Sequence, residues 1–77
     1  MQIQIKAEIT FPGELKDEPI ICSLCKDFDI TLNIIEASFS TEIGWAILIF
    51  KGKDDEIKRA FDFLRSKGVK IENASKL

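Results

Sequence analysis

The segment from residue 30 to residue 39, ITLNIIEASF, limits most strongly how this chain can fold. It is rich in β-branched and aliphatic residues, which predicts a β-strand. Ile30, Leu32 and Ile34 alternate onto one face of that strand. The opposite face is also largely apolar, and its residues are Thr31, Asn33, Ile35, Ala37 and Phe39. A strand with two apolar faces needs cover on both, and in a 77-residue chain we expect the second cover to come from another molecule.

Asn33 is a polar residue within that second apolar face. A buried amide without hydrogen-bond partners costs about 1–3 kcal/mol, so Asn33 must find partners. The backbone, the same residue of a second copy, and a polar group of a ligand are all compatible with its position. The residue pattern alone leaves these alternatives open.

The length of 77 residues predicts one domain, residues 1–77, with a core over about 2–73. A domain this small buries only about 60% of its unfolded surface, and oligomerisation is a common remedy. Eleven basic residues against thirteen acidic ones, with no basic stripe, argue against nucleic acid as a partner. The apolar run from Trp45 to Phe50 is too short to insert into a membrane. An alternating strand pattern directly after Met1 leaves no room for a signal peptide, which predicts a cytoplasmic protein.

Periodicity predicts the order β-α-β-β-α-β. The expected elements are a strand at 2–11 that ends at the Pro12-Gly13 turn, a helix from Pro19 to about Asp29, a strand at 30–39, a hairpin connection at 40–44, a strand at 45–50, a helix from 54 to about 67, a strand at 69–72 and a frayed tail at 73–77. This order predicts an α+β, ferredoxin-like fold: a four-stranded antiparallel sheet with two helices on one face. The first and third strands are expected at the centre. The uncovered face is expected to be apolar across the second and third strands, which marks a contact surface.

The chain offers few groups for catalysis or metal binding. It has no His, and its two cysteines, Cys22 and Cys25, are spaced C-x-x-C. The helical pattern puts Cys25 on the buried arc and Cys22 at its edge, so we favour core packing over a redox or metal pair. The acidic run Asp54-Asp55-Glu56 fits a helix N-terminus better than a cation site. We therefore expect no enzyme activity, no cofactor and no metal.

Several segments together resemble the NIL domain over about residues 9–73. They are Phe11-x-Gly13, Pro19-Ile20-Ile21-x-x-Leu24, Phe28-Asp29-Ile30, Asn33-Ile34-Ile35 and Ala60-x-x-x-Leu64-x-x-x-Gly68-Val69-Lys70-Ile71-Glu72. The resemblance implies the same ferredoxin-like, ACT-like fold. It also implies a role: NIL domains at the C-terminus of methionine importer ATPases pair and bind methionine, which inhibits further uptake. Other NIL domains stand alone or are fused to iron–sulfur ferredoxin modules.

The resemblance aligns Asn33 with the Asn of the family motif, which belongs to the methionine-responsive site. Ile35 stands where the motif has Leu, and the connection after the second strand is shorter than in transporter proteins. The chain has neither a G-x-x-x-x-G-K-[ST] phosphate-binding loop nor a ferredoxin cysteine array. It therefore resembles either the sensor without the ATPase or a sensor domain cut out of a larger protein.

The resulting prediction is a non-enzymatic regulatory domain that binds methionine or a related sulfur amino acid at the interface of a homodimer. The predicted ligand-binding residues are Asn33, Ile35 and Ala37, where the two apolar side chains receive the thioether chain. A transporter or a protein of sulfur metabolism is the expected partner. The alternative is a protein-interaction module of sulfur amino-acid metabolism that binds no small molecule.

Overall fold

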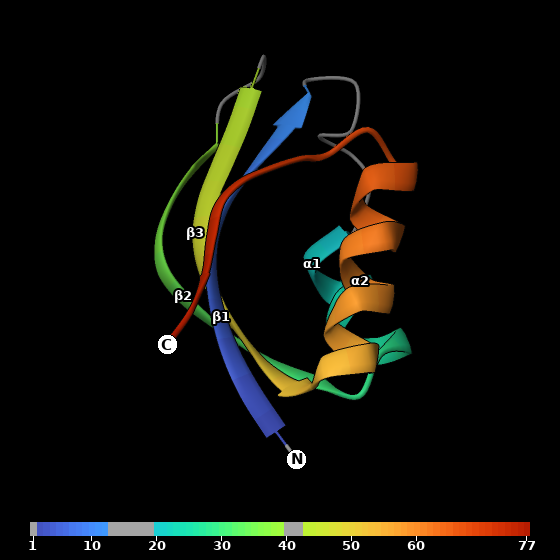
Figure 1. Ribbon diagram of the computed structural model, residues 1–77. Coiled ribbons are helices and arrows are strands. Elements are labelled where there is room, and N and C mark those ends of the chain that lie inside the picture. The colour runs from blue at the N-terminus through green and yellow to red at the C-terminus, as the bar shows by residue number, and fades with distance from the viewer. Residues whose placement is uncertain (1, 13–19, 40–42) are drawn as a thin grey trace.

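The computed structural model describes residues 2–12, 20–39 and 43–77. Within these ranges the elements are β1 (Gln2–Pro12), α1 (Ile20–Asp27), β2 (Ile30–Phe39), β3 (Ile43–Lys53), α2 (Asp54–Ser66) and β4 (Lys70–Lys76). The strands form an antiparallel sheet in the order β2-β3-β1-β4, so β1 and β3 are central. Both helices lie on one side of this sheet (Figure 1). The predicted ferredoxin-like fold is confirmed. The predicted Gly13 turn, the helix start at Pro19 and most of the hairpin connection lie outside the described residues.

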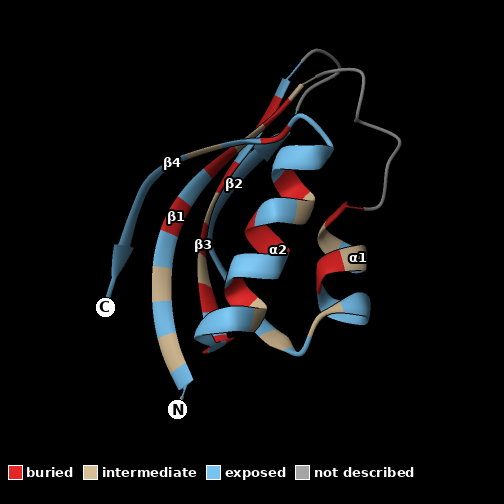
Figure 2. Ribbon diagram, turned by 45° about the vertical axis from the view of Figure 1, so that its right-hand side comes forward, coloured by how far each residue is buried: buried red, intermediate tan, exposed pale blue. Residues whose placement is uncertain are grey.

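The core lies between the sheet and the two helices. Alternation along β1 and β3 turns every second side chain toward the helices. The buried hydrophobic residues are Ala7, Ile9, Phe11, Ile20, Leu24, Ala46, Leu48, Phe50, Ile57, Ala60, Phe61, Leu64 and Val69. Figure 2 shows the buried positions of α2 as a stripe that faces the sheet. At the centre, the rings of Phe50 and Phe61 meet edge to face, with their centroids 4.9 Å apart.

The acidic first turn of α2 connects this helix to the start of β2. The backbone N–H of Asp29 donates a hydrogen bond to Oε2 of Glu56 (2.9 Å). The same carboxylate pairs with Arg59 one turn along the helix. The hydrogen bond from Asp29, and to a smaller extent Arg59, holds the pKa of Glu56 below its ordinary value of 4.5. The ionised carboxylate of Glu56 thus contributes to the fold.

The substitution Glu56→Gln is expected to reduce stability at neutral pH and to have little effect in acid. A carboxyl with a lowered folded pKa stabilises the fold above its unfolded pKa, and this contribution fades as the pH falls through the folded value. Urea midpoints of wild type and variant at about pH 7 and about pH 3 measure the difference. Asp62→Asn is the matched control, because Asp62 also pairs with an arginine three residues on but is 65% exposed. Equal losses in both variants would contradict a role for the Asp29 hydrogen bond.

The C-terminal tail is ordered as part of β4, so the predicted fraying from residue 73 is wrong. Ser75 pairs with Lys6, and the N–H of Leu77 donates to the carbonyl of Gln4 (2.9 Å). The register of β4 shifts in its middle, where Asn73 adopts a positive φ of 53°. Asn tolerates this left-handed conformation, which allows the chain to resume pairing beyond it. The Asn73 amide also donates to Glu8 (3.2 Å) on the neighbouring strand.

Both cysteines are exposed on α1, so the predicted core packing of Cys25 is wrong. The buried residues of α1 are Ile20 and Leu24, which lie one turn apart on a narrow stripe. Cys25 follows Leu24 directly and is therefore rotated by about 100° away from that stripe. The helix has only eight residues and contacts the sheet along one side alone. No helix in the described ranges is long and apolar enough to cross a membrane.

Candidate functional site

An irregularity in β2 decides which of its side chains share a face. Asn33 pairs with Ile49 and Ile34 with Leu48, but the next pairs are Glu36 with Ile47 and Ala37 with Ala46. Ile35 lies at the shift between these two registers. β2 thus has one extra residue at this point. Because side chains alternate between the two faces of a strand, one extra residue moves every later side chain of β2 to the opposite face.

The predicted common face of Asn33, Ile35 and Ala37 is therefore wrong for Ala37. Its partner Ala46 is buried in the core, so Ala37 lies on the helix side of the sheet. Phe39 also lies on that side, where its ring is 5.7 Å from Phe11. A side chain at Gly44 would collide with the Phe39 ring, so the glycine is required for this contact. Whether Asn33 or Ile35 contacts a ligand stays a prediction.

The open face is the side of the sheet away from the helices. At its centre it consists of Lys6, Glu8, Thr10, Asn33, Glu36, Ser38, Trp45, Ile47 and Ile49. The register arranges these residues in three cross-strand rows: Asn33–Ile49–Lys6, Glu36–Ile47–Glu8 and Ser38–Trp45–Thr10. Directly opposite side chains in such rows are about 4.5–5.5 Å apart at Cβ, and successive rows about 7 Å. The open face thus carries an apolar centre from β3 between polar side chains of β1 and β2.

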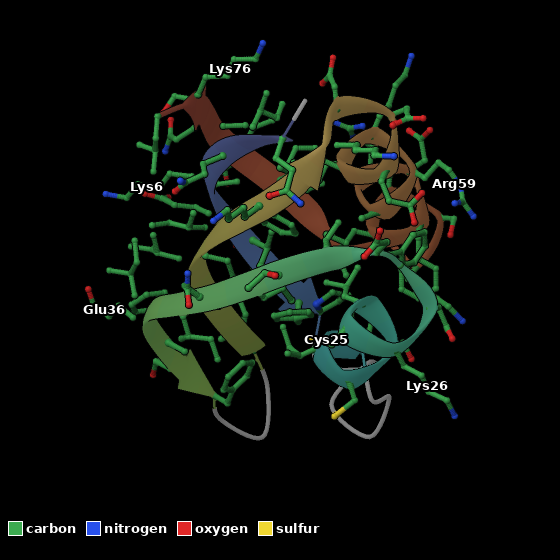
Figure 3. All side chains as sticks on the ribbon, turned by 90° about the horizontal axis from the view of Figure 1, so that it is seen from below. Lys6, Cys25, Lys26, Glu36, Arg59 and Lys76 are labelled. Atoms are coloured by element: carbon green, nitrogen blue, oxygen red, sulfur yellow. The ribbon has the colours of Figure 1, made fainter. Side chains whose placement is uncertain are left out.

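Charges of opposite sign occupy adjacent rows of the open face. Lys6 lies in the row of Asn33, and Glu36 and Glu8 flank Ile47 in the next row. Figure 3 shows Lys6 and Glu36 on the same side of the sheet, away from the helices. Within the described ranges, neither of these two side chains takes part in a salt bridge. An ammonium and a carboxylate of a ligand would both find an opposite charge here.

A shallow depression of 380 Å³ lies on the open face, over the β1 and β3 members of the rows of Ile47 and Trp45. The residues that line it are Glu8, Ile9, Thr10, Ile43, Trp45 and Ile47. This volume falls within the range of small-molecule sites. Asn33, Ile35 and Ala37 are not among its lining residues, although Ile47 is only one row from Asn33. Alternation along the first strand already predicts Lys6 and Glu8 on this face, whereas Glu36 was not predicted here because its position depends on the register shift at Ile35.

Large exposed hydrophobic side chains concentrate on β2 and β3. Those in this half of the sheet, here called the β2–β3 apolar surface, are Ile34, Ile35, Phe39, Ile43 and Trp45. This surface extends over both faces of the sheet, since Ile34 and Phe39 lie on the helix side and Ile43 and Trp45 on the open face. Their exposed fractions are between 36% and 62%. β2 is also an edge strand, so one side of its backbone has no neighbouring strand within the described sheet. Apolar exposure next to a free strand edge is typical of a surface that a partner covers.

In the described part of the chain, no three His, Cys, Asp or Glu side chains are placed so that together they could hold a metal ion. Glu8 contributes to the pairing of β1 with β4, because its carboxylate accepts a hydrogen bond from the Asn73 side-chain amide. Glu8 also lies directly opposite Glu72 on β4. Lys70 lies 3.6 Å from Glu72 and offsets the repulsion between the two opposed carboxylates. The arrangement on the open face is suited to non-covalent recognition of a small polar molecule with an apolar part.

Comparison with known proteins places this geometry in a family. The family model for the NIL domain matches residues 6–73. The chain is 37% identical over 68 residues to the methionine import ATP-binding protein MetN of Helicobacter pylori, which covers 83% of this chain and 21% of that protein. It is 36% identical over 70 residues to MetN 2 of Acinetobacter baylyi, covering 86% of this chain and 20% of the relative. The chain thus spans about a fifth of the length of these curated relatives.

A solved structure shows the same fold. It is the C-terminal domain of an ABC transporter/ATP-binding protein from Enterococcus faecalis, with a TM-score of 0.74 and 22% sequence identity. The alignment covers 87% of this chain and 79% of that one. The family match extends over nearly all of the sheet and both helices, from β1 into β4. This chain belongs to the NIL domain family.

Proposed function

We propose that the chain is a non-enzymatic regulatory domain that binds methionine or a related sulfur amino acid where two copies meet. The observation that carries the proposal is its membership of the NIL family, with relatives named as methionine import ATP-binding proteins. Because the chain spans about a fifth of those relatives, the partner is proposed to be the ATPase part of a cytoplasmic transporter subunit. Ligand occupancy would then report the internal amino-acid concentration to that partner.

The chemistry of the open face supports an amino-acid ligand. A free amino acid is a zwitterion, and Lys6 and Glu36 offer the two opposite charges in adjacent rows. Asn33 lies in the row of Lys6, and its amide can both donate to the carboxylate and accept from the ammonium. Ile47 and Ile49 lie between these polar groups and offer contact to a thioether chain. We propose Lys6, Asn33, Glu36 and Ile49 as the ligand contacts, with Ile35 kept from the residues predicted by sequence, and leave Ala37, on the other face, out of the set.

The β2–β3 apolar surface supports pairing of two copies. Ile35 is 50% exposed and Phe39 62% exposed, next to the free backbone edge of β2. A second copy would remove this surface from water, at a gain of about 25 cal/mol per Å² of apolar area. The ligand residues Asn33 and Ile35 lie on the same strand, so the second copy would also enclose a shallow site.

The substitution Ile35→Lys is expected to convert the dimer into a folded monomer. A lysine in a buried interface loses its hydration without gaining a partner, whereas on a monomer it stays in water. Sedimentation velocity at micromolar concentrations measures the change in mass. Leu77→Lys is the matched control, since Leu77 is 67% exposed but lies outside the β2–β3 apolar surface. A wild type that sediments as a monomer over this range contradicts the proposed pairing.

Thermal unfolding with added amino acids tests the proposed ligand. A ligand selective for the native state stabilises it by about 2.7 kcal/mol at one hundred times its Kd. We expect methionine to raise the melting temperature and leucine, of similar size but without sulfur, to raise it much less. The rival function, a protein-interaction module, is favoured by the β2–β3 apolar surface, whose side chains are 36% to 62% exposed. That rival predicts no shift with any amino acid.

A further inference from the structure

We infer that Cys22 and Cys25 on α1 form a two-thiolate site for a soft monovalent metal ion of the copper(I) class. Both side chains are exposed and neither is in a disulfide. Figure 3 shows Cys25 on the opposite side of the sheet from Lys6 and Glu36, and Cys22 belongs to the same helix, α1, which covers the helix side (Figure 1). The inference therefore concerns a surface separate from the open face.

Packing does not account for these two cysteines. Cysteine is among the residues most often buried in proteins, and as a small hydrophobic residue it normally fills core space. Here the core contacts of α1 come from Ile20 and Leu24, which are 4% and 0% exposed. Both cysteines are exposed, and at 100° per residue they are rotated away from the stripe of Ile20 and Leu24. Exposed free thiols are accessible to oxidants, disulfide exchange and metal ions. A pair of them on one short helix is therefore better explained by chemistry at the surface than by core packing.

Helix geometry brings the two thiols to one side and decides what they can bind. Positions three residues apart differ by about 60° around the axis, and their Cβ atoms are about 5–6 Å apart. A disulfide requires Cβ atoms only about 3.5–4.5 Å apart, so oxidation within α1 needs a distortion of the helix. A metal ion with bonds of about 2.3 Å to each sulfur allows the sulfurs to stand up to about 4.6 Å apart. A bridging ion fits the undistorted helix better than a disulfide does.

The number of ligands selects the class of metal. The chain has two cysteines and no histidine, and among the described residues no three His, Cys, Asp or Glu side chains are placed so that together they could hold a metal ion. Structural zinc takes four ligands in a tetrahedron, which one copy of this pair does not supply. Thiolates are soft ligands that select copper(I), zinc and iron–sulfur clusters, and the last two take four protein ligands, which leaves copper(I) for a pair of thiolates. Each thiol releases its proton to solvent as its sulfur binds, so no electron transfer is involved.

The test is an anaerobic titration of the whole chain with copper(I), held reduced by ascorbate, in competition with the coloured chelator bicinchoninate. Wild type is expected to withdraw one copper ion per chain. Cys22→Ser and Cys25→Ser should each weaken binding at least tenfold, and the double variant should withdraw none. Lys26→Ala, next to Cys25 and also exposed, is the matched control and should behave as wild type. Circular dichroism checks that every variant keeps the fold.

Three results would overturn the inference. The first is a wild type that does not compete with the chelator. The second is a serine variant, folded by circular dichroism, that binds copper(I) as tightly as wild type does. The third is withdrawal of one copper(I) ion per two chains, which would replace the two-coordinate site by a four-cysteine site shared between copies.

Discussion

Phe50→Ala is expected to lower the free energy of unfolding by about 3–5 kcal/mol, the largest effect of any substitution considered. Phe50 is completely buried at the centre of β3, and its ring meets that of Phe61 edge to face. The substitution removes the ring and leaves a cavity between the sheet and α2. Small domains have total stabilities of only about 5–15 kcal/mol, so the variant should be largely unfolded at modest urea concentrations.

Ile49→Ala is the matched control for Phe50→Ala. Ile49 precedes Phe50 in β3, and its side chain lies half-buried on the open face. Its truncation removes apolar contact from a wet surface and should cost about 1 kcal/mol. Urea denaturation curves of both variants provide the comparison. Similar losses in the two would contradict the assignment of one covered and one open face to the sheet.

Asn33→Ala is expected to weaken methionine binding by about 1–3 kcal/mol, which is roughly tenfold to a hundredfold. The amide lies on the open face in the row of Ile49 and Lys6. There it can donate a hydrogen bond to the carboxylate of an amino acid and accept one from its ammonium group. The alanine variant should fold as wild type does, because Asn33 is exposed and contributes nothing to the core. Calorimetric titration of methionine into both proteins measures the ratio of the two dissociation constants.

Ala37→Ser tests on which face of β2 the ligand binds. Strict alternation would put residue 37 beside Asn33, whereas the register puts it opposite Ala46 on the helix side. The serine variant should therefore bind methionine with the affinity of wild type. A loss as large as that of Asn33→Ala would show that both faces of β2 contact the ligand.

The order of the elements and most of the core are predictable from the sequence. Alternation in β1 and the helical stripe of Ile57, Ala60, Phe61 and Leu64 identify the buried residues because one side of each element is polar. The exposed cysteines escaped prediction because α1 is short and buries a narrower stripe than a full helical face. The extension of β4 to Lys76 depends on the left-handed backbone of Asn73, which no periodicity reports.

The candidate site was predictable only in part, and the reason is the shift at Ile35. The apolar positions of β2 have even numbers up to Ile34 and odd numbers at Ala37 and Phe39. Such a change of parity is typical of a bulge, because one extra residue exchanges the faces of everything after it. If the strand is assumed to be continuous, its second face is predicted to be apolar and Glu36 is predicted on the other face. The register shift instead places Glu36 opposite Ile47 on the open face.

The central claim is that this NIL domain binds a sulfur amino acid through the open face, and calorimetric titration of methionine into the wild-type chain tests it most directly. Saturable binding at one methionine per chain is expected, with much weaker binding of leucine and a loss of at least tenfold in Asn33→Ala. Absence of binding to the folded wild type, or equal affinities in wild type and Asn33→Ala, would contradict it.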